Sequence, residues 1–137
     1  MQDLHVRRYM TASPYTMDRD QAVTDAESLM KLHGIRHLPV VEGTTLVGVI
    51  SELEIGFLVA LRTRLPDRLP LGDVMTANPY VVAPDEDLQE VARHLVERKE
   101  SCAVIVDKGR VVGVFTQIDA LRALIDLVAK TRSIPPS

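Results

Sequence analysis

The chain has 137 residues, of which 46% are hydrophobic, which is enough for one ordinary domain or for two very small units that share a core. It lacks an apolar run of about 20 residues and an apolar leader, so we expect neither a membrane span nor a secretory signal. The net charge of −3 argues against a nucleic-acid partner, and the single cysteine, Cys102, indicates a buried thiol in a reducing cytoplasm rather than a disulfide or zinc site.

An internal repeat organises almost the whole chain. Shifted by 65 positions, residues 4–57 align with residues 69–122 without a gap, and eleven positions are identical. The opening Met-Thr-Ala-Ser-Pro-Tyr of residues 10–15 falls on Met-Thr-Ala-Asn-Pro-Tyr of residues 75–80. Most other positions keep their apolar or polar character. A gapless match of this length predicts two copies of one fold.

Each copy opens with a short strand and a helix. The strands are expected to begin at residues 16–17 and 81–82. Asp20 and Asp85 occupy positions where a helix N-cap belongs, and apolar residues at helical spacing follow them. Gly34 is suited to end the first helix with a positive φ. Its counterpart is Lys99, which predicts either strain or a different turn geometry at the end of the second helix.

A hairpin of two apolar strands and a closing helix complete each copy. The strands are expected at residues 38–41 and 46–50 in the first copy and at residues 103–106 and 111–115 in the second. Because they are apolar at almost every position, both faces of each sheet should be buried, and one copy is too small to cover such a sheet. We therefore predict an α/β (α+β) fold in which two β-α-β-β-α repeats pack sheet to sheet with pseudo-two-fold symmetry. The expected boundaries are residues 4–62 for the first repeat, 63–70 for a linker, 71–130 for the second repeat and 131–137 for a C-terminal tail.

The closing helices, expected at residues 51–65 and 117–129, are apolar around almost their whole circumference. A helix of this kind must be buried on more than one side. We therefore predict a symmetric homodimer through these helices. The alternative is a monomer whose terminal segments fold over them.

The strand-to-helix junction of each copy carries a hydroxyl residue and, three positions later, an acid. The pairs are Ser51 with Glu54 and Thr116 with Asp119. This spacing is the capping-box pattern, which explains either pair without a ligand. The same geometry suits a nucleotide: a helix N-terminus favours phosphate, Thr116 adds a hydroxyl donor, and Asp119 has the reach to accept both hydroxyls of a ribose. Glu54 is one methylene longer, so two equivalent sites are not expected.

Three motifs resemble the CBS domain family: the Met-Thr-x-x-Pro opening, the run Gly-Ile-Arg-His-Leu-Pro-Val-Val at residues 34–41, and Gly-h-h-Ser/Thr-x-x-Asp, where h is apolar. Two such units in tandem resemble a CBS pair, or Bateman module, over about residues 4–130. The resemblance implies a regulatory adenosine-type ligand (AMP, ADP, ATP or S-adenosylmethionine) bound in clefts between the repeats. It also implies no required cofactor and a conformational signal to an unidentified regulated protein.

The resemblance further implies a main cleft in which Thr116 binds phosphate or ribose and Asp119 binds the ribose diol. The other residues of this cleft are Thr11 and Thr16 near the adenine, Ile35, Arg36 and His37 as the opposite wall, and Ser101 and Ile118. A second, pseudo-symmetric cleft would comprise Thr76, Val81, Glu100, Ser101 and Cys102 with Arg36, Ser51, Leu53 and Glu54. There Glu54 replaces the ribose aspartate and Glu100 brings a negative charge that opposes a phosphate, so we expect one competent site.

Other chemistry finds little support in the sequence. His33 and His37 stand four positions apart, but Gly34 breaks the helix between them, so no metal site is expected. There is no nucleophile elbow, P-loop or Ser–His–Asp order, so we expect no enzyme activity. For Arg36, a surface ion pair is an equal alternative to ligand binding. The leading hypothesis is a nucleotide-sensing homodimer; the others are a structural dimerisation module without ligand and a small enzyme.

Overall fold

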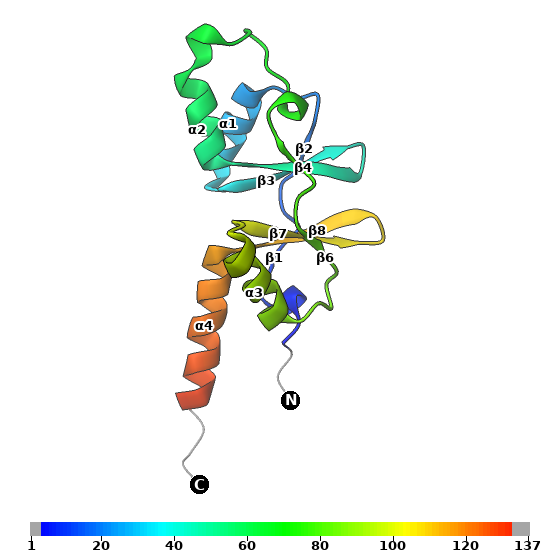
Figure 1. The fold of residues 1–137 in the computed structure, drawn as a ribbon, viewed down its shortest axis with the longest axis vertical. Coiled ribbons are helices and arrows are strands. Elements are labelled where there is room, and N and C mark those ends of the chain that lie inside the picture. Colours follow the sequence, from blue (N-terminus) through cyan, green and yellow to red (C-terminus); the bar gives the residue numbers. More distant parts are fainter. Residues whose placement is uncertain (1–3, 133–137) are drawn as a thin grey trace. The chain divides into compact units, whose positions relative to one another are not determined.

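The computed structural model describes residues 4–132, which form four α-helices and two four-stranded β-sheets (Figure 1). These residues divide into two compact units. The first, which we call the Asp119 unit, comprises residues 4–13, 80–107 and 112–132. The second, the Glu54 unit, comprises residues 14–79 and 108–111. Of the expected C-terminal tail, residues 133–137 lie outside the described part of the chain, and residues 131 and 132 belong to the last helix.

The Glu54 unit contains a sheet with the strand order β2-β3-β4-β5. Its elements are β2 (Met17–Asp18), α1 (Val23–His33), β3 (His37–Glu42), β4 (Thr45–Ser51), α2 (Glu52–Ala60) and β5 (Thr76–Ala77), with 3-10 turns at Arg62–Arg64 and Leu71–Asp73. β2 runs parallel to β3, whereas β4 is antiparallel to both of its neighbours. The predicted hairpin is confirmed: Leu38 pairs with Ile50, and Gly43, with a φ of 64°, opens its two-residue loop.

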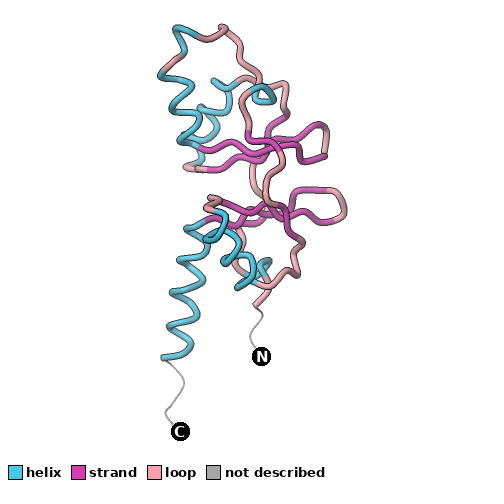
Figure 2. Tube along the Cα trace, in the orientation of Figure 1, coloured by secondary structure: helices cyan, strands magenta, loops and turns pink. Residues whose placement is uncertain are grey.

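The Asp119 unit repeats this plan with the strand order β1-β8-β7-β6. Its elements are a 3-10 turn at Val6–Arg8, β1 (Thr11–Ala12), β6 (Val81–Val82), α3 (Leu88–Arg98), β7 (Cys102–Asp107), β8 (Arg110–Thr116) and α4 (Gln117–Arg132). The first two residues of β8 and the loop before them are counted in the Glu54 unit by the division above. Figure 2 shows the tight loop that joins the two long strands of this sheet. In that loop Lys108 and Gly109 have φ values of 52° and 76°, as a type I′ turn requires at both central positions.

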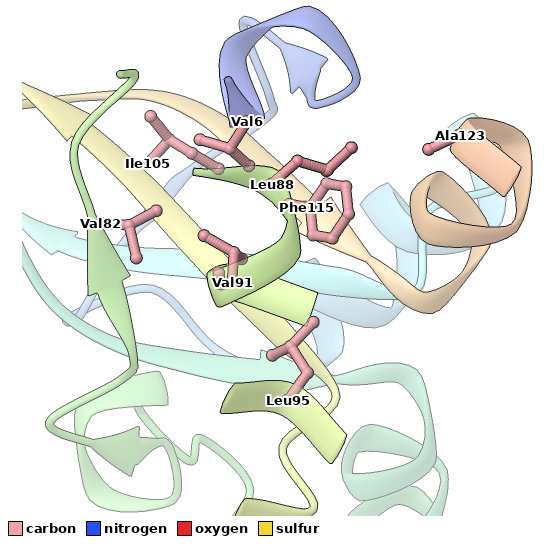
Figure 3. Packing of buried hydrophobic residues seen from close by; sticks show 9 residues of the cluster. Val6, Val82, Leu88, Val91, Leu95, Ile105, Phe115 and Ala123 are labelled. Atoms are coloured by element: carbon pink, nitrogen blue, oxygen red, sulfur yellow. The ribbon is translucent and has the colours of Figure 1, made fainter. Parts of the chain in front are cut away.

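Each unit has its own apolar core between its sheet and its two helices. In the Asp119 unit the core contains Val6, Val82, Leu88, Val91, Leu95, Ala103, Ile105, Phe115 and Ala123 (Figure 3). In the Glu54 unit it contains Met17, Val23, Ala26, Met30, Leu38, Val40, Ile50, Ile55 and Leu71. Full burial of such a side chain stabilises the fold by about 1.5–3 kcal/mol. The helical spacing of apolar residues therefore identified most of the inner faces of α1 and α3, but Val96, which the same spacing placed on the inner face of α3, is 77% exposed.

The opening segment of each sequence copy pairs with the hairpin of the other copy, which the sequence analysis did not predict. β1 precedes the helix of the first copy, yet it pairs antiparallel with β8. β5 precedes the helix of the second copy and pairs antiparallel with β4. Both segments turn directly before a proline, at Ser13 and Asn78, whose φ values are 50° and 53°. Each compact unit therefore contains parts of both sequence copies.

Both predicted helix N-caps are wrong by two residues. The expected caps were Asp20 and Asp85, and the observed caps are Ala22 and Asp87. After β2 the chain first makes a turn in which the Asp18 carboxylate accepts the N–H of Asp20, so α1 begins later. In the second copy the Asp87 carboxylate accepts the N–H of Glu90 and caps α3. Short Asp side chains stabilise turns as well as helix caps, so an aspartate before a helical pattern does not by itself locate the N-cap.

The helix C-termini are closer to prediction. Gly34 ends α1 with a φ of 63°, as expected, and Lys99 ends α3 in the same left-handed conformation with a φ of 54°. Of the two alternatives for Lys99, the structure therefore shows the strained one. The closing helix expected at residues 51–65 ends earlier, at Ala60, because the N–H of Leu61 bonds the carbonyls of Phe57 and Leu58 and the chain tightens into a 3-10 turn.

Replacing Gly48 with alanine should destabilise the protein. A Cβ at Gly48 would overlap the Met75 side chain and lie 2.9 Å from the backbone oxygen of Thr76, because Gly48 on β4 pairs with Ala77 on β5. Overpacking of this kind lowers the free energy of unfolding by about 1–3 kcal/mol. The matched control is Gly56→Ala on α2, where a Cβ meets nothing within 4 Å. This substitution should raise the free energy of unfolding by about 0.5–1 kcal/mol. Urea denaturation would measure both, and equal effects would contradict this account.

Candidate functional site

The Asp119 carboxylate is a buried charge at the junction between β8 and α4. Thr116 ends β8, α4 begins at Gln117, and Asp119 lies in the first turn of the helix with only 2% of its surface exposed. A buried carboxylate is costly unless it is hydrogen-bonded or paired with a cation. The groups that satisfy Asp119 therefore define what this site can bind.

Three hydrogen bonds and one cation meet at this carboxylate. Oδ2 accepts the N–H of Thr116 at 3.0 Å and its hydroxyl at 3.3 Å. Oδ1 accepts the Thr11 hydroxyl at 3.0 Å, and Arg122 Nη1 lies 3.7 Å from the same oxygen. The N–H of Asp119 in turn bonds the Thr116 hydroxyl oxygen at 3.4 Å, so the pair also has the reciprocal pattern of a cap. The site gathers hydroxyl donors on a buried anion, as a sugar-binding acid does.

Thr11 is held at this position by the N-terminal segment of the Asp119 unit. Two residues earlier, the hydroxyl of Tyr9 donates a 2.7 Å hydrogen bond to Asp126 Oδ2 on α4. That bond raises the pKa of Tyr9 and lowers the pKa of Asp126. The segment therefore contacts α4 at Asp119 and again about two turns further along, at Asp126.

The Glu54 unit contains the same arrangement with a longer acid. Glu54 Oε1 accepts the N–H and hydroxyl of Ser51 at 3.2 and 2.9 Å, and Oε2 accepts the Thr76 hydroxyl at 3.3 Å. The N–H of Glu54 also bonds the Ser51 hydroxyl, which completes a capping box. Ser51, Glu54 and Thr76 correspond to Thr116, Asp119 and Thr11 across the repeat. The predicted capping box at Ser51 and Glu54 is confirmed.

The remaining residues predicted for the main cleft belong to different units. Ser101 precedes β7, and Ile118, 43% exposed, lies on α4; both are in the Asp119 unit. Thr16, Ile35, Arg36 and His37 are in the Glu54 unit. There, Ile35 and Arg36 line a groove of about 590 Å³ between α1 and α2, and Arg36 Nε lies 3.8 Å from Glu52 Oε2. Arg36 thus has the surface ion pair that was its alternative role. Joint action of these residues with Asp119 stays a prediction.

The residues predicted for the second cleft are divided in the same way. Arg36, Ser51, Leu53, Glu54 and Thr76 lie in the Glu54 unit, whereas Val81, Glu100, Ser101 and Cys102 lie in the Asp119 unit. Cys102 is 6% exposed, so the prediction of a buried thiol is confirmed.

Glu100 has a neighbour that the sequence analysis did not pair with it. His94 Nε2 lies 3.4 Å from its carboxylate, and the His94 ring stacks on Tyr80 with the ring centroids 3.6 Å apart. Burial raises the pKa of the Tyr80 hydroxyl, and the nearby carboxylates of Glu86 and Glu100 raise it further. His94 stands six positions before Glu100, on α3, so the spacing alone carried no signal for this contact.

Metal-binding clusters and membrane-spanning helices are two further features that bear on function. Within residues 4–132, no group of three His, Cys, Asp or Glu side chains is placed to hold a metal ion. In the same range, no helix has both the length and the apolar character that a membrane crossing requires.

The comparisons with known proteins identify the family. The sequence model of the family described as CBS domain matches residues 6–55 and 71–126, and the chain belongs to that family. It is similar to the CBS domain-containing protein YhcV of Bacillus subtilis, with 30% identity over 112 residues that cover 80% of this chain and 77% of YhcV. The tandem CBS domain pair predicted from the sequence is confirmed.

Some relatives are much longer than this chain. Inosine-5′-monophosphate dehydrogenase of Korarchaeum cryptofilum is 30% identical over 83% of this chain. The A-adding tRNA nucleotidyltransferase of Aquifex aeolicus is 32% identical over 88% of it. The chain spans 22% of the first protein and 14% of the second.

Solved structures share the fold and hold adenosine compounds. CBSX2 from Arabidopsis thaliana in complex with AMP is 29% identical, with a TM-score of 0.76 over 90% of this chain and 97% of that one. The CBS domain pair of MJ0100, in complex with 5′-methylthioadenosine and S-adenosyl-L-methionine, is 27% identical, with a TM-score of 0.77 over 88% of this chain and 98% of that one. The predicted α+β fold of two repeats is confirmed.

Replacing Thr11 with valine should destabilise the Asp119 unit. Valine keeps the β-branched shape but removes the hydroxyl that donates to the buried Asp119, and a lost hydrogen bond to a charged group costs about 1.5–3 kcal/mol. The control is Thr76→Val. Glu54 is only half-buried and its bond to Thr76 is longer, so water should replace the hydroxyl and the loss should stay below about 1 kcal/mol. Thermal unfolding of both variants checks this; a larger loss from Thr76→Val would contradict it.

Proposed function

We propose that this chain is a regulatory module that binds an adenosine-type ligand at Asp119 and passes a conformational signal to a protein partner. The observation that carries the proposal is the buried Asp119 carboxylate, surrounded by the hydroxyls of Thr11 and Thr116. Membership of the CBS domain family and the AMP complex of CBSX2 support it.

A ribose suits this carboxylate because its two neighbouring hydroxyls are both donors. Asp119 already accepts hydroxyl hydrogens from two threonines, so the local geometry admits O–H groups on this acid. The first N–H groups of the 16-residue helix α4 begin beside it, and a helix N-terminus favours a phosphate. We infer that Thr116 and Asp119 contact ribose and phosphate, with Thr11, Ser101 and Ile118 close by.

The Glu54 motif is proposed to be the weaker site. Its carboxylate carries one more methylene than that of Asp119, is half-buried rather than buried, and forms a capping box with Ser51. A ribose there would meet an acid of different reach in a more hydrated position. We therefore expect one competent ligand site per chain and no chemical turnover of the ligand.

Replacing Asp119 with alanine should weaken ligand binding strongly. Calorimetry with AMP, ADP, ATP and S-adenosylmethionine would compare the wild type, Asp119→Ala and the matched variant Glu54→Ala. We expect at least one ligand to bind the wild type, a loss of about tenfold or more in Asp119→Ala, and little change in Glu54→Ala. Melting curves without ligand would verify that both variants fold. Equal affinities in the wild type and Asp119→Ala would remove the site assignment.

We further propose that the chain forms a homodimer through α2 and α4. Both helices carry large apolar side chains that the described residues leave exposed, among them Phe57 at 69%, Leu124 at 57% and Ile125 at 70%.

A purely structural dimerisation module is the second candidate function. The capping bonds of both hydroxyl–acid pairs favour it, because they satisfy those side chains without a ligand.

A charge on either helix should dissociate the dimer. Phe57→Glu and Leu124→Glu place a carboxylate on exposed positions, so the fold should persist while the apolar contact is lost. Leu58 is less suitable because it packs against the core of the Glu54 unit. The control is Leu32→Glu on α1, which is 77% exposed and outside both closing helices. Sedimentation equilibrium should give monomer masses for the first two variants and a dimer for the control; a monomeric wild type would refute the dimer.

A further inference from the structure

Arg122 is a cation that any ligand on the Asp119 carboxylate would meet. It stands one helical turn after Asp119 on α4, and its Nη1 lies 3.7 Å from Asp119 Oδ1. The side chain of Arg122 is 71% exposed, whereas that of Asp119 is 3% exposed. An exposed guanidinium thus lies close to a buried anion.

The hydrogen bonds of Asp119 leave room on the oxygen nearest Arg122. A carboxylate accepts about four hydrogen bonds. Thr116 supplies two donors to Oδ2 and Thr11 supplies one to Oδ1, so the open acceptor position belongs to Oδ1. At 3.7 Å the guanidinium is beyond hydrogen-bond distance of that oxygen, and an ion pair of this length whose cation is exposed to solvent is weak. A sugar hydroxyl can therefore replace Arg122 at Oδ1.

A hydroxyl that takes this position leaves the charge of Arg122 in need of a new partner. The 5′ group of a nucleoside projects from the same small ring, within reach of a long arginine side chain. Guanidinium groups bind phosphate in a bidentate, charge-assisted manner. We propose that Arg122 pairs with the 5′ group and makes the site select adenosine compounds by charge, favouring a 5′-phosphate over a neutral 5′ substituent. This rests on the proposed function, because it takes Asp119 as the ribose acceptor.

The second hydroxyl–acid pair lacks this cation. The position equivalent to Arg122 is Phe57, an apolar side chain that is 69% exposed. Glu54 accepts hydrogen bonds from Ser51 and Thr76 as Asp119 does from Thr116 and Thr11, so the two motifs differ in the acid and in this cation. Charge selection is therefore assigned to the Asp119 site.

The test compares two ligands that share the adenosine core. AMP carries a 5′-phosphate and 5′-methylthioadenosine carries a neutral 5′ thioether, and calorimetry would measure both on the wild type, Arg122→Gln and Arg122→Lys. The wild type should bind AMP about tenfold more tightly than 5′-methylthioadenosine. Arg122→Gln should bring the two affinities close together without weakening 5′-methylthioadenosine. Arg122→Lys should keep part of the preference, because it keeps the charge but not the bidentate geometry.

A charge control and the salt dependence separate this role of Arg122 from an effect of net charge. Arg132→Gln makes the same charge change on α4, about 20 Å from Asp119 along the helix, and should leave the AMP preference unchanged. Because Arg122 is exposed, the wild-type preference should also shrink as salt is raised.

Four results would overturn the assignment. An unchanged preference in Arg122→Gln, or an equal loss of both ligands, would refute the role of Arg122 while leaving the Asp119 site intact. A wild-type preference for AMP that does not respond to salt would refute the role of Arg122 without any variant. A wild type that binds neither compound would overturn the proposed function as well.

Discussion

The hydrogen bonding of one buried carboxylate connects the main features of the Asp119 unit. Asp119 is 2% exposed and is satisfied from two directions, by Thr116 at the end of its own strand and by Thr11 from a segment 108 positions earlier. An uncompensated charge in this position would cost several kcal/mol. The exchange of β1 onto β8 brings the required hydroxyl, so fold and site share a single requirement.

The two halves of the chain show how a duplicated motif diverges. Both strand–helix junctions carry a hydroxyl, an acid three residues later, and a threonine from the exchanged strand. In the Glu54 unit the longer acid closes a complete capping box and stays half-buried. In the Asp119 unit the side chain of the shorter acid is only 3% exposed, and Arg122 Nη1 lies 3.7 Å from its Oδ1. Both pairs cap a helix, and they differ by one methylene in the acid and by the residue three positions after it, which is Phe57 in one unit and Arg122 in the other.

Helix α4 links the candidate site to a surface. Its first turn holds Asp119, and Ala123, one turn further, packs into the core of the same unit. Leu124 and Ile125, which follow Ala123, are left exposed by the described residues. In the proposed function a ligand at the start of this helix and a partner along its outer face would act on one rigid element, which allows binding energy to shift a conformational equilibrium.

The sequence by itself determined the repeat, through the match of the chain with itself at a shift of 65 residues, and several features that depend on neighbours within about ten residues. These features are both hairpins, the left-handed helix end at Gly34, and the pairing of a hydroxyl with an acid at each strand–helix junction. Tertiary structure alone decided the exchange of β1 and β5, the contact of Thr11 with Asp119 and the place of Arg122. Strands of two residues have no readable periodicity, and their partners are chosen by packing between segments distant in sequence. The helix starts were misjudged for a related reason, since Asp18 and Asp20 stabilise a local turn that competes with the cap.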